Sequence, residues 1–210
     1  DRILSIFTRE KGRVDAKARG CRRPKSPLLA CSQPFVFGEF QLFQMKDRYV
    51  VDQCDVRETF YPLREDIQKL TAAMAMLDMA QQVVQEGEAN EELFSLLYHT
   101  LSFLCYGDCH PADLTIYFMI RLLNAIGYRP SLIACASCEK DLRAMRRLYF
   151  STALGGALCP DCAAGRGERQ VSSLALEALL RMLRLTDEEM QRVRLPGHVH
   201  LLPLAPDPLR

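Results

Sequence analysis

The sequence lacks any hydrophobic run long enough to cross a membrane, and its first residues lack the pattern of a secretory leader. The apolar stretch Leu114–Ile120, which has Thr115 inside it, is far shorter than the roughly 20 residues that a membrane-spanning helix needs. The residues after Asp1 do not follow the charged, apolar and small-residue order of a signal peptide. We therefore expect a cytoplasmic protein, and because the first residue is not Met, we expect further sequence upstream of it.

The sequence also lacks the motifs of common catalytic sites. It has no Gly-x-x-x-x-Gly-Lys-Ser/Thr loop for nucleotide phosphates and no visible nucleophile–histidine–acid arrangement. It has four histidines, of which His198 and His200 form a lone His-x-His pair that we interpret as surface histidines. These absences favour a protein that is not an enzyme and acts by binding.

Charge is strongly segregated along the chain, although the net charge is only +1. Residues 1–50 hold 11 Lys and Arg against 5 Asp and Glu, whereas residues 51–110 hold 3 against 11 and residues 111–210 hold 13 against 10. With 49% hydrophobic residues, the 210-residue chain can bury the core of one large domain or two small ones. The basic first segment predicts contact with a polyanion.

The first part of the chain, to about Glu58, has the pattern of short β-strands. In RVDAKAR (13–19) small or apolar residues alternate with charged ones, which predicts a strand with a mostly basic outer face. FVFGEFQLFQ (35–44) and RYVVDQCDV (48–56) are rich in Phe, Val and Tyr, and Gly38 in the first indicates a bulge or a bend. Short strands without intervening helices predict a small barrel or sandwich.

From Pro62 onward the hydrophobic period changes to that of helices. The first helix is expected to end before Gly87. Its expected inward stripe consists of Leu63, Ile67, Leu70, Met74, Leu77 and Val84. Further helices are expected after an Asn90 cap, after Pro111 and over 174–185. The fold class we predict is α+β, with a β domain ahead of an all-α domain.

The strongest motif is a pair of Cys-x-x-Cys knuckles. Cys135 and Cys138 form the first knuckle, and Cys159 and Cys162 form the second after 20 intervening residues. Two knuckles supply the four thiolates of a tetrahedral Zn²⁺ site, and this spacing matches the zinc-ribbon pattern. Because four protein ligands leave no open position on the metal, we predict one structural zinc ion per chain, with a short hairpin over 148–159.

Other interpretations of the cysteines stay open. The knuckles could be the dithiols of a redox enzyme or a redox-regulated chaperone, or a chance set of buried thiols. A zinc ribbon is also compatible with a scaffold for transcription or RNA processing. The remaining cysteines show no metal-ligand spacing and are expected to be ordinary, mostly buried thiols: Cys21, Cys31, Cys54, Cys105 and Cys109.

A basic stretch, REKGRVDAKARGCRRPKS, covers residues 9–26. Its composition alone does not decide between two interpretations. The stretch could be a solvated strand face, or it could be a surface that binds nucleic-acid phosphates. The candidate phosphate contacts are Arg9, Lys11, Arg13, Lys17, Arg19, Arg22, Arg23 and Lys25. Aromatic residues nearby could stack on bases, although a place in the core is commoner for such residues: Phe35, Phe37, Phe40 and Phe43.

The segment TREKGRVDAKARGCRRPKSPLLACSQPFVFGEFQL resembles the front of the bacterial recombination mediator family RecO. LREDIQKL, the all-helical middle and YFSTALGGALCPDC resemble the rest of that family in the same order, to about residue 185. The resemblance implies an N-terminal OB-fold over residues 1–60 and a helical domain over 61–210 with a zinc element at 135–162. The family pattern has one more strand ahead of Asp1, so the first strand of the barrel is expected to be absent here.

The resemblance also implies a function. Members of the family bind single- and double-stranded DNA, anneal complementary strands, and engage RecR and the tail of single-strand-binding protein to help load RecA; no nucleotide hydrolysis is attributed to them. That tail is acidic with an apolar end, so we expect an apolar pocket with a basic rim. The helical domain offers Arg121 and Arg129 for the rim, beside Leu122, Leu123 and Tyr128.

Overall fold

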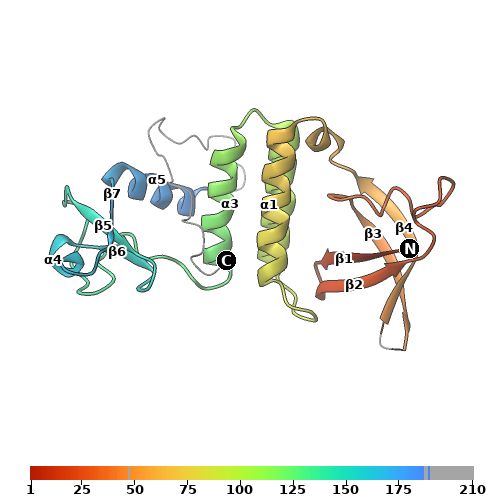
Figure 1. Cartoon of the computed structure of the whole chain (residues 1–210), viewed down its shortest axis with the longest axis horizontal. Coiled ribbons are helices and arrows are strands. Elements are labelled where there is room, and N and C mark those ends of the chain that lie inside the picture. The colour runs from red at the N-terminus through yellow and green to blue at the C-terminus, as the bar shows by residue number, and fades with distance from the viewer. Residues whose placement is uncertain (47, 187–188, 190–210) are drawn as a thin grey trace.

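The structure, a computed structural model, describes residues 1–46, 48–186 and 189. The molecule is elongated, with a four-stranded sheet at one end, helices in the middle and a three-stranded sheet at the other end (Figure 1). The N-terminal strands precede the helices along the chain, so the predicted α+β class is confirmed. The Pro-rich tail and the His198–His200 pair lie outside the described residues.

The N-terminal sheet consists of β1 (Arg2–Thr8), β2 (Gly12–Ala18), β3 (Phe37–Met45) and β4 (Arg48–Glu58), in the spatial order β1-β2-β4-β3. β1 pairs with β2, and β3 with β4, in antiparallel fashion, whereas β2 and β4 are parallel. The alternation predicted for β2 is confirmed, because its small side chains face inward and are buried: Val14, Ala16 and Ala18.

This sheet is not closed within the described residues, since β1 and β3 are its two edges. The barrel that the sequence predicts is therefore not confirmed, although the bulge expected at Gly38 is present as a shift in the β3–β4 register. The sequence pattern does not single out β1. Its residue Ile3 is 67% exposed while Leu4 and Ile6 point inward, so apolar side chains occupy both faces and the period of two is obscured.

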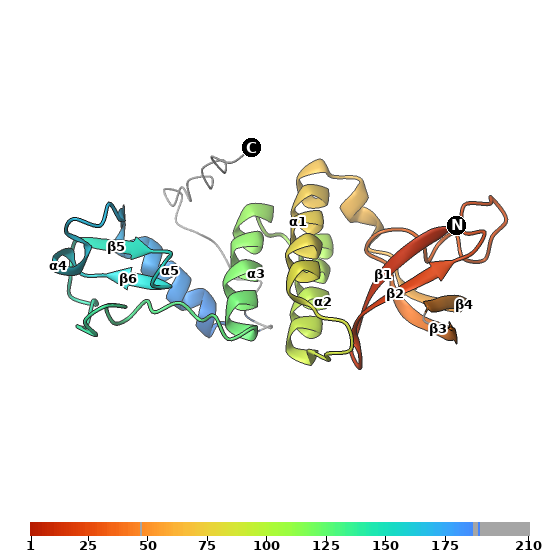
Figure 2. The ribbon, with the colours of Figure 1, turned by 60° about the horizontal axis from the view of Figure 1, so that its bottom comes forward.

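Helices α1 (Ile67–Val83), α2 (Glu91–Tyr106) and α3 (Pro111–Ala125) form the middle of the molecule, after the 3-10 turn η1 (Tyr61–Arg64) (Figure 2). The Asn90 side chain accepts a hydrogen bond of 2.9 Å from the backbone N–H three residues on, which caps α2 as expected. The predicted starts of α2 and α3 are confirmed. Among the helices of the described residues, none has the length and apolar composition that a membrane span requires.

The inward stripe predicted for α1 is partly wrong. Ile67 is 74% exposed and Met74 is 47% exposed, whereas Met76 and three alanines of the helix are buried. Asp66 accepts hydrogen bonds from two backbone N–H groups of the first turn, so the regular helix begins only at Ile67. Leu63 lies in η1, and Leu70, Leu77 and Val84, at intervals of seven from it, pack in the same core as expected. The buried alanines let α1 pack closely against α3.

The C-terminal sheet comprises β5 (Leu148–Ser151), β6 (Gly156–Leu158) and β7 (Arg169–Val171), in the order β6-β5-β7. The short helix α4 (Pro160–Ala163) follows β6, and α5 (Ser173–Arg184) packs against the core of this sheet. The hairpin predicted from the sequence is β5–β6, and the helix predicted over 174–185 is α5. Both predictions are confirmed.

Aromatic side chains join the N-terminal sheet to α2. Phe7 meets Phe94 edge-on with ring centroids 5.4 Å apart, and Phe37 packs against Tyr98 at 4.6 Å. Phe60, which follows β4, contacts the same tyrosine at 5.9 Å. Each such pair contributes about 0.5–1.5 kcal/mol beyond the burial of its area. The sheet is therefore held against the helical part of the chain at several points.

The turn between β1 and β2 also touches the loop between α1 and α2 through the backbone. The Arg13 N–H donates to the Gln85 carbonyl at 3.2 Å, and the Gly87 N–H donates to the Lys11 carbonyl at 3.0 Å. Gly12, between these two contacts, is buried and has φ +61°. A Cβ at this position would collide with carbonyl oxygens of the loop, so both the conformation and the close approach require glycine.

We predict that Gly12→Ala destabilises the protein more than Gly87→Ala. Both glycines have positive φ, which costs an alanine about 1–2 kcal/mol, but a Cβ at Gly87 meets no atom within 4 Å. At Gly12 the collision adds about 1–3 kcal/mol of overpacking. Urea unfolding of the two variants measures the difference directly. Equal free energies of unfolding would show that the close approach does not constrain the turn.

Candidate metal centre and nucleic-acid surface

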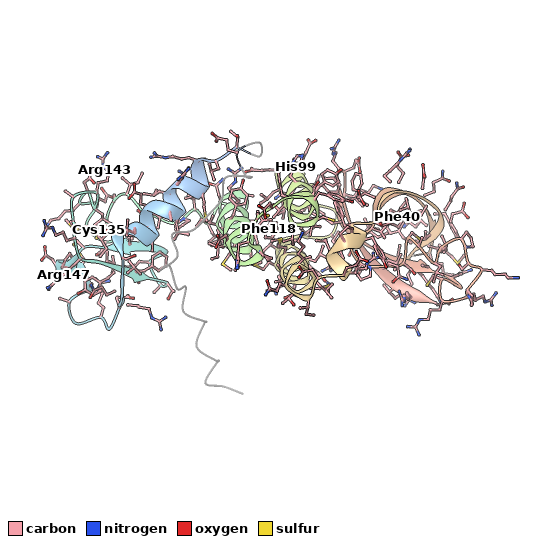
Figure 3. All side chains as sticks on the ribbon, turned by 90° about the horizontal axis from the view of Figure 1, so that it is seen from above. Phe40, His99, Phe118, Cys135, Arg143 and Arg147 are labelled. Carbon is pink, nitrogen blue, oxygen red and sulfur yellow. The ribbon has the colours of Figure 1, made fainter. Side chains whose placement is uncertain are left out.

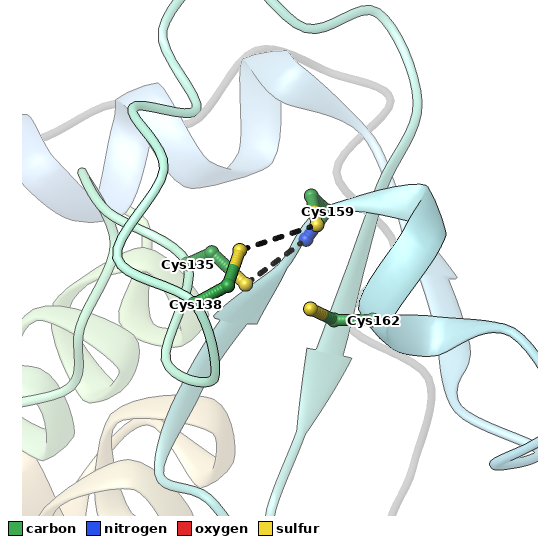
Figure 4. Close-up of side chains that lie close together, drawn as sticks. All are labelled: Cys135, Cys138, Cys159 and Cys162. Carbon is green, nitrogen blue, oxygen red and sulfur yellow. Dashed lines mark hydrogen bonds between the residues drawn. The ribbon is translucent and has the colours of Figure 1, made fainter.

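The four predicted metal ligands lie together (Figure 4). Cys135 and Cys138 belong to the loop that follows α3, whereas Cys159 immediately precedes α4 and Cys162 lies within it. All four Sγ atoms lie within 4.8 Å of one another, and the Sγ atoms of Cys138 and Cys159 are 3.7 Å apart. The two knuckles are thus brought together by the β5–β6 hairpin that connects them.

The cluster fits a tetrahedral metal ion. With Zn–S bonds of about 2.3 Å, the sulfurs of a regular tetrahedron lie about 3.8 Å apart, close to the observed separation of Cys138 and Cys159. Cys135 and Cys159 are buried, whereas Cys138 is exposed and Cys162 is partly buried. The residues present can therefore hold one metal ion, anchored from the interior by one thiol of each knuckle.

The pKa values of two of the four thiols, Cys135 and Cys162, are shifted in opposite directions. Burial alone would raise the pKa of the Cys135 thiol, but backbone N–H groups directed at its sulfur, first that of Cys159, lower its pKa to about 6. A hydrogen bond to Ser137 lowers the pKa of Cys162, but the adjacent thiols outweigh it and raise that pKa to about 12. Neighbouring thiolates repel each other, so a cation is needed before all four can ionise together.

The four cysteines pack against a separate small hydrophobic core, at the end of the molecule far from the N-terminal sheet. Figure 3 shows Cys135 near one end and Phe40 near the other. Lys140 ties the two knuckles together, with its Nζ 3.3 Å from Asp161 Oδ2. The hydrogen bond to Asp161 raises the pKa of Lys140, and the charges of Asp161 and of two cysteines add to this. The buried apolar residues beneath the cluster include Leu132, Leu142, Leu148, Leu158 and Leu176.

The structure divides the predicted basic stretch between the two ends of β2. The turn group, defined as Arg9, Lys11 and Arg13, lies at the β1–β2 turn. The loop group, defined as Arg19, Arg22, Arg23 and Lys25, follows the opposite end of the strand. Seven residues of β-strand span about 23 Å, so one contiguous stretch of sequence forms two separate groups of charge. Lys17 lies near the second, with its Nζ 3.1 Å from Asp1 Oδ2.

The turn group already has partners within the protein. The Arg9 Nε lies 3.5 Å from Glu91 Oε1, and the guanidinium lies 5.7 Å from the ring centroid of Phe94 on α2. The Arg13 Nε lies 3.9 Å from Asp15 Oδ1. These side chains therefore face carboxylates as well as solvent.

The loop group is more open. All four of its side chains are exposed, and within the described part of the chain none of them forms an ion pair. The backbone that carries them is ordered by consecutive turns, in which the Arg23 N–H donates to the Gly20 carbonyl and the Ser26 N–H donates to the Arg23 carbonyl, each at 3.0 Å. The loop group thus presents its charge to solvent from a defined backbone.

The aromatic residues considered for base stacking lie mostly in the core. Phe35 is 6% exposed, and Phe37 packs against Tyr98 of α2. Phe40 is partly buried in the cluster beneath the N-terminal sheet. Phe43 is 40% exposed, so of the four it is the one that offers its ring to solvent.

The two arginines predicted to form the rim of a partner pocket have different surroundings. Arg121, on α3, donates from Nη1 to the Leu185 carbonyl at 2.9 Å, and its guanidinium lies 6.0 Å from the Tyr117 ring centroid. It therefore fixes the end of α5 against α3, a role that no sequence pattern indicates. Arg129 is exposed in the loop beyond Gly127.

The chain thus combines an N-terminal β-sheet that carries basic residues with a helical part that ends in a possible four-cysteine metal site. This combination defines the class of protein. Two family models match the chain, described as recombination protein O N terminal over residues 1–60 and recombination protein O C terminal over residues 64–199. The chain therefore belongs to the recombination protein O (RecO) family.

Individual relatives agree with this assignment. The DNA repair protein RecO of Acetivibrio thermocellus is 38% identical over 180 residues, which cover 85% of this chain and 71% of that protein. The DNA repair proteins RecO of Alkaliphilus metalliredigens and Symbiobacterium thermophilum are each 33% identical over 201 residues, which cover 95% of this chain and 81% and 79% of those proteins. The resemblance inferred from the sequence is confirmed.

We predict one bound zinc ion per purified chain, and a loss of that zinc on Cys135→Ser. The substitution removes a buried thiolate, and three remaining thiolates hold Zn²⁺ less tightly than four. Limited proteolysis should then cut the Cys135→Ser protein first between residues 131 and 171. The matched control is Cys54→Ser, which changes a partly buried thiol of the N-terminal sheet. Equal zinc content in the two variants, or none in the wild type, would contradict the assignment.

Proposed function

We propose that this chain is a non-enzymatic mediator of DNA repair and homologous recombination that acts in the cytoplasm at the nucleoid. It binds single- and double-stranded DNA, anneals complementary strands and, with RecR, helps to load RecA onto strands coated with single-strand-binding protein. The observation that carries the proposal is the exposed loop group on the N-terminal sheet of a RecO-family chain. The four-cysteine set, which as a zinc site leaves no open coordination position, supports a structural role for the metal rather than a catalytic one.

We further propose that the N-terminal sheet is the larger part of an OB-fold. Its two edge strands, β1 and β3, both line a groove of about 1210 Å³ that also touches α1 and α2. The lining is rich in apolar side chains, which include Leu4, Phe7, Phe37, Leu42, Leu97 and Leu101. Edge strands present unpaired backbone N–H and C=O groups. A strand ahead of Asp1 would satisfy both edges and fill the groove, which closes the sheet into a barrel.

We propose that DNA phosphates bind the basic stretch, and we predict that a triple change in the loop group weakens this binding. If about six phosphates are neutralised, the logarithm of the affinity for single strands falls with log salt at a slope near −4. Replacing Arg19, Arg22 and Arg23 by Ala should weaken binding and reduce the slope to about −2, because three phosphate contacts are lost. Fluorescence anisotropy of a labelled oligonucleotide across a salt series measures both quantities.

The control for this experiment removes the same amount of charge elsewhere. Arg146, Arg147 and Arg166 are exposed residues at the far end of the molecule, and their replacement by Ala should leave the slope near that of the wild type. If the loop-group variant keeps both the affinity and the slope of the wild type, the loop group does not bind DNA.

For the acidic tail of single-strand-binding protein we propose a receptor around Arg121 and Arg129. The Arg121 Nε is buried and has no hydrogen-bond partner among the described residues. An apolar neighbour, Leu122, is buried, and Tyr128 is 74% exposed. A carboxylate of the tail would satisfy the guanidinium, and the exposed ring would cover the apolar end of the tail.

We predict that Arg121→Glu abolishes binding of a tail peptide and that Arg129→Glu weakens it several-fold. Because Arg121 also holds Leu185, the exposed Arg129 provides a test that does not depend on folding. Arg166→Glu, with the same change of charge in the C-terminal sheet region, is the control. Calorimetry with the synthetic tail reports the affinities. Wild-type affinity in both the Arg121 and Arg129 variants would remove the proposed receptor.

A further inference from the structure

The loop between α1 and α2 places glutamates directly against the turn group. The backbone of Glu86 forms bridges with both Gly12 and Arg13. Glu91, at the start of α2, forms the ion pair with Arg9. Part of the acidic segment 51–110 is thus fixed beside part of the predicted DNA surface.

The charges at this contact do not favour a polyanion. The turn group supplies three positive charges, and four glutamates lie within seven residues of the opposing loop: Glu86, Glu88, Glu91 and Glu92. Glu91 is paired with Arg9, whereas the other three form no ion pair within the described part of the chain. All four are exposed. A phosphate that approached the turn would meet more negative than positive charge.

The geometry keeps these carboxylates within electrostatic range of the turn. The Gly87 N–H donates to the Lys11 carbonyl at 3.0 Å, so the two backbones are in direct contact. Charges interact over a Debye length of about 8 Å at physiological salt. The loop group lies beyond the other end of β2, about 23 Å along the strand, and is therefore screened from the same glutamates.

The contact is also rigid. Gly12 has no room for a side chain, and the hydrogen bonds on either side of it close the turn onto the loop. The edge-on contact between Phe7 and Phe94 holds β1 to α2 just beyond the turn. The backbone that carries the glutamates cannot move away when a ligand approaches without breaking this packing.

We propose that the α1–α2 loop is an electrostatic stop that ends the nucleic-acid path at the β1–β2 turn. A bound strand contacts the loop group and Lys17 and is kept off the turn group. The strand is thereby held at the outer end of the molecule, away from the helices (Figure 1). This inference rests on the proposed function, because it presupposes that the N-terminal sheet binds DNA, and it narrows the phosphate contacts proposed for the basic stretch to the loop group and Lys17.

The test neutralises the stop and compares it with the same change of charge elsewhere. Glu86→Gln with Glu88→Gln should bind single-stranded oligonucleotides 3- to 10-fold more tightly than the wild type at low salt. The salt slope should become steeper by about 0.7 for each phosphate newly contacted. The control is Glu65→Gln with Glu177→Gln, two exposed positions outside the α1–α2 loop, and it should leave the affinity and the slope unchanged.

A photo-crosslinking residue at position 11 or position 23 locates the strand in the same proteins. In the wild type, position 23 should crosslink to DNA and position 11 should not; in Glu86→Gln with Glu88→Gln, both should crosslink. Equal gains of affinity in the test and control pairs, or crosslinking at position 11 in the wild type, would overturn the stop while leaving DNA binding intact. A wild-type chain that binds no DNA would overturn the proposed function as well.

Discussion

The contact between the β1–β2 turn and the α1–α2 loop is the constraint on which the arrangement of the molecule depends. It joins the basic segment 1–50 to the acidic segment 51–110 through main-chain hydrogen bonds on both sides of Gly12. Because the contact is made by backbone, side-chain repacking cannot relax it. The aromatic pairs between the sheet and α2 belong to the same interface and hold the sheet in the orientation that the turn contact allows.

This arrangement assigns different physical tasks to the two ends of the molecule. At one end, the loop group presents unpaired positive charge from an ordered backbone, as far as the described residues extend. At the other end, the four-thiol cluster brings two knuckles together over a small apolar core. The cluster and the loop group lie at opposite ends of the molecule (Figures 1 and 3), so a metal ion in the cluster would stabilise the C-terminal sheet and would not contact phosphates at the loop group. The acidic helical middle separates the two ends.

The sequence predicts the features that local chemistry determines. The Asn90 cap and Pro111 identify the starts of two helices, because capping and the fixed φ of proline act on the first helical turn alone. The spacing of the two Cys-x-x-Cys pairs is specific enough to identify the four-cysteine cluster. The stripe predicted for α1 is wrong at Ile67 and Met74, because hydrophobic periodicity counts large side chains and misses the small alanines that α1 buries instead. The packing of the β1–β2 turn against the α1–α2 loop could not be predicted, because it joins residues about 75 positions apart in the sequence. Gly12 precedes the predicted strand at 13–19, so in the sequence it indicates only a turn and not the close approach of the loop backbone.

The proposed mediator function is tested most directly by the annealing of complementary single strands that are coated with single-strand-binding protein. Loss of signal from a fluorescent dye that reports single strands follows the reaction in real time, with and without this chain. We predict faster annealing with the wild-type chain and little acceleration when Arg19, Arg22 and Arg23 are replaced by Ala. Annealing at the same rate in the presence and absence of the wild-type chain would contradict the proposed function.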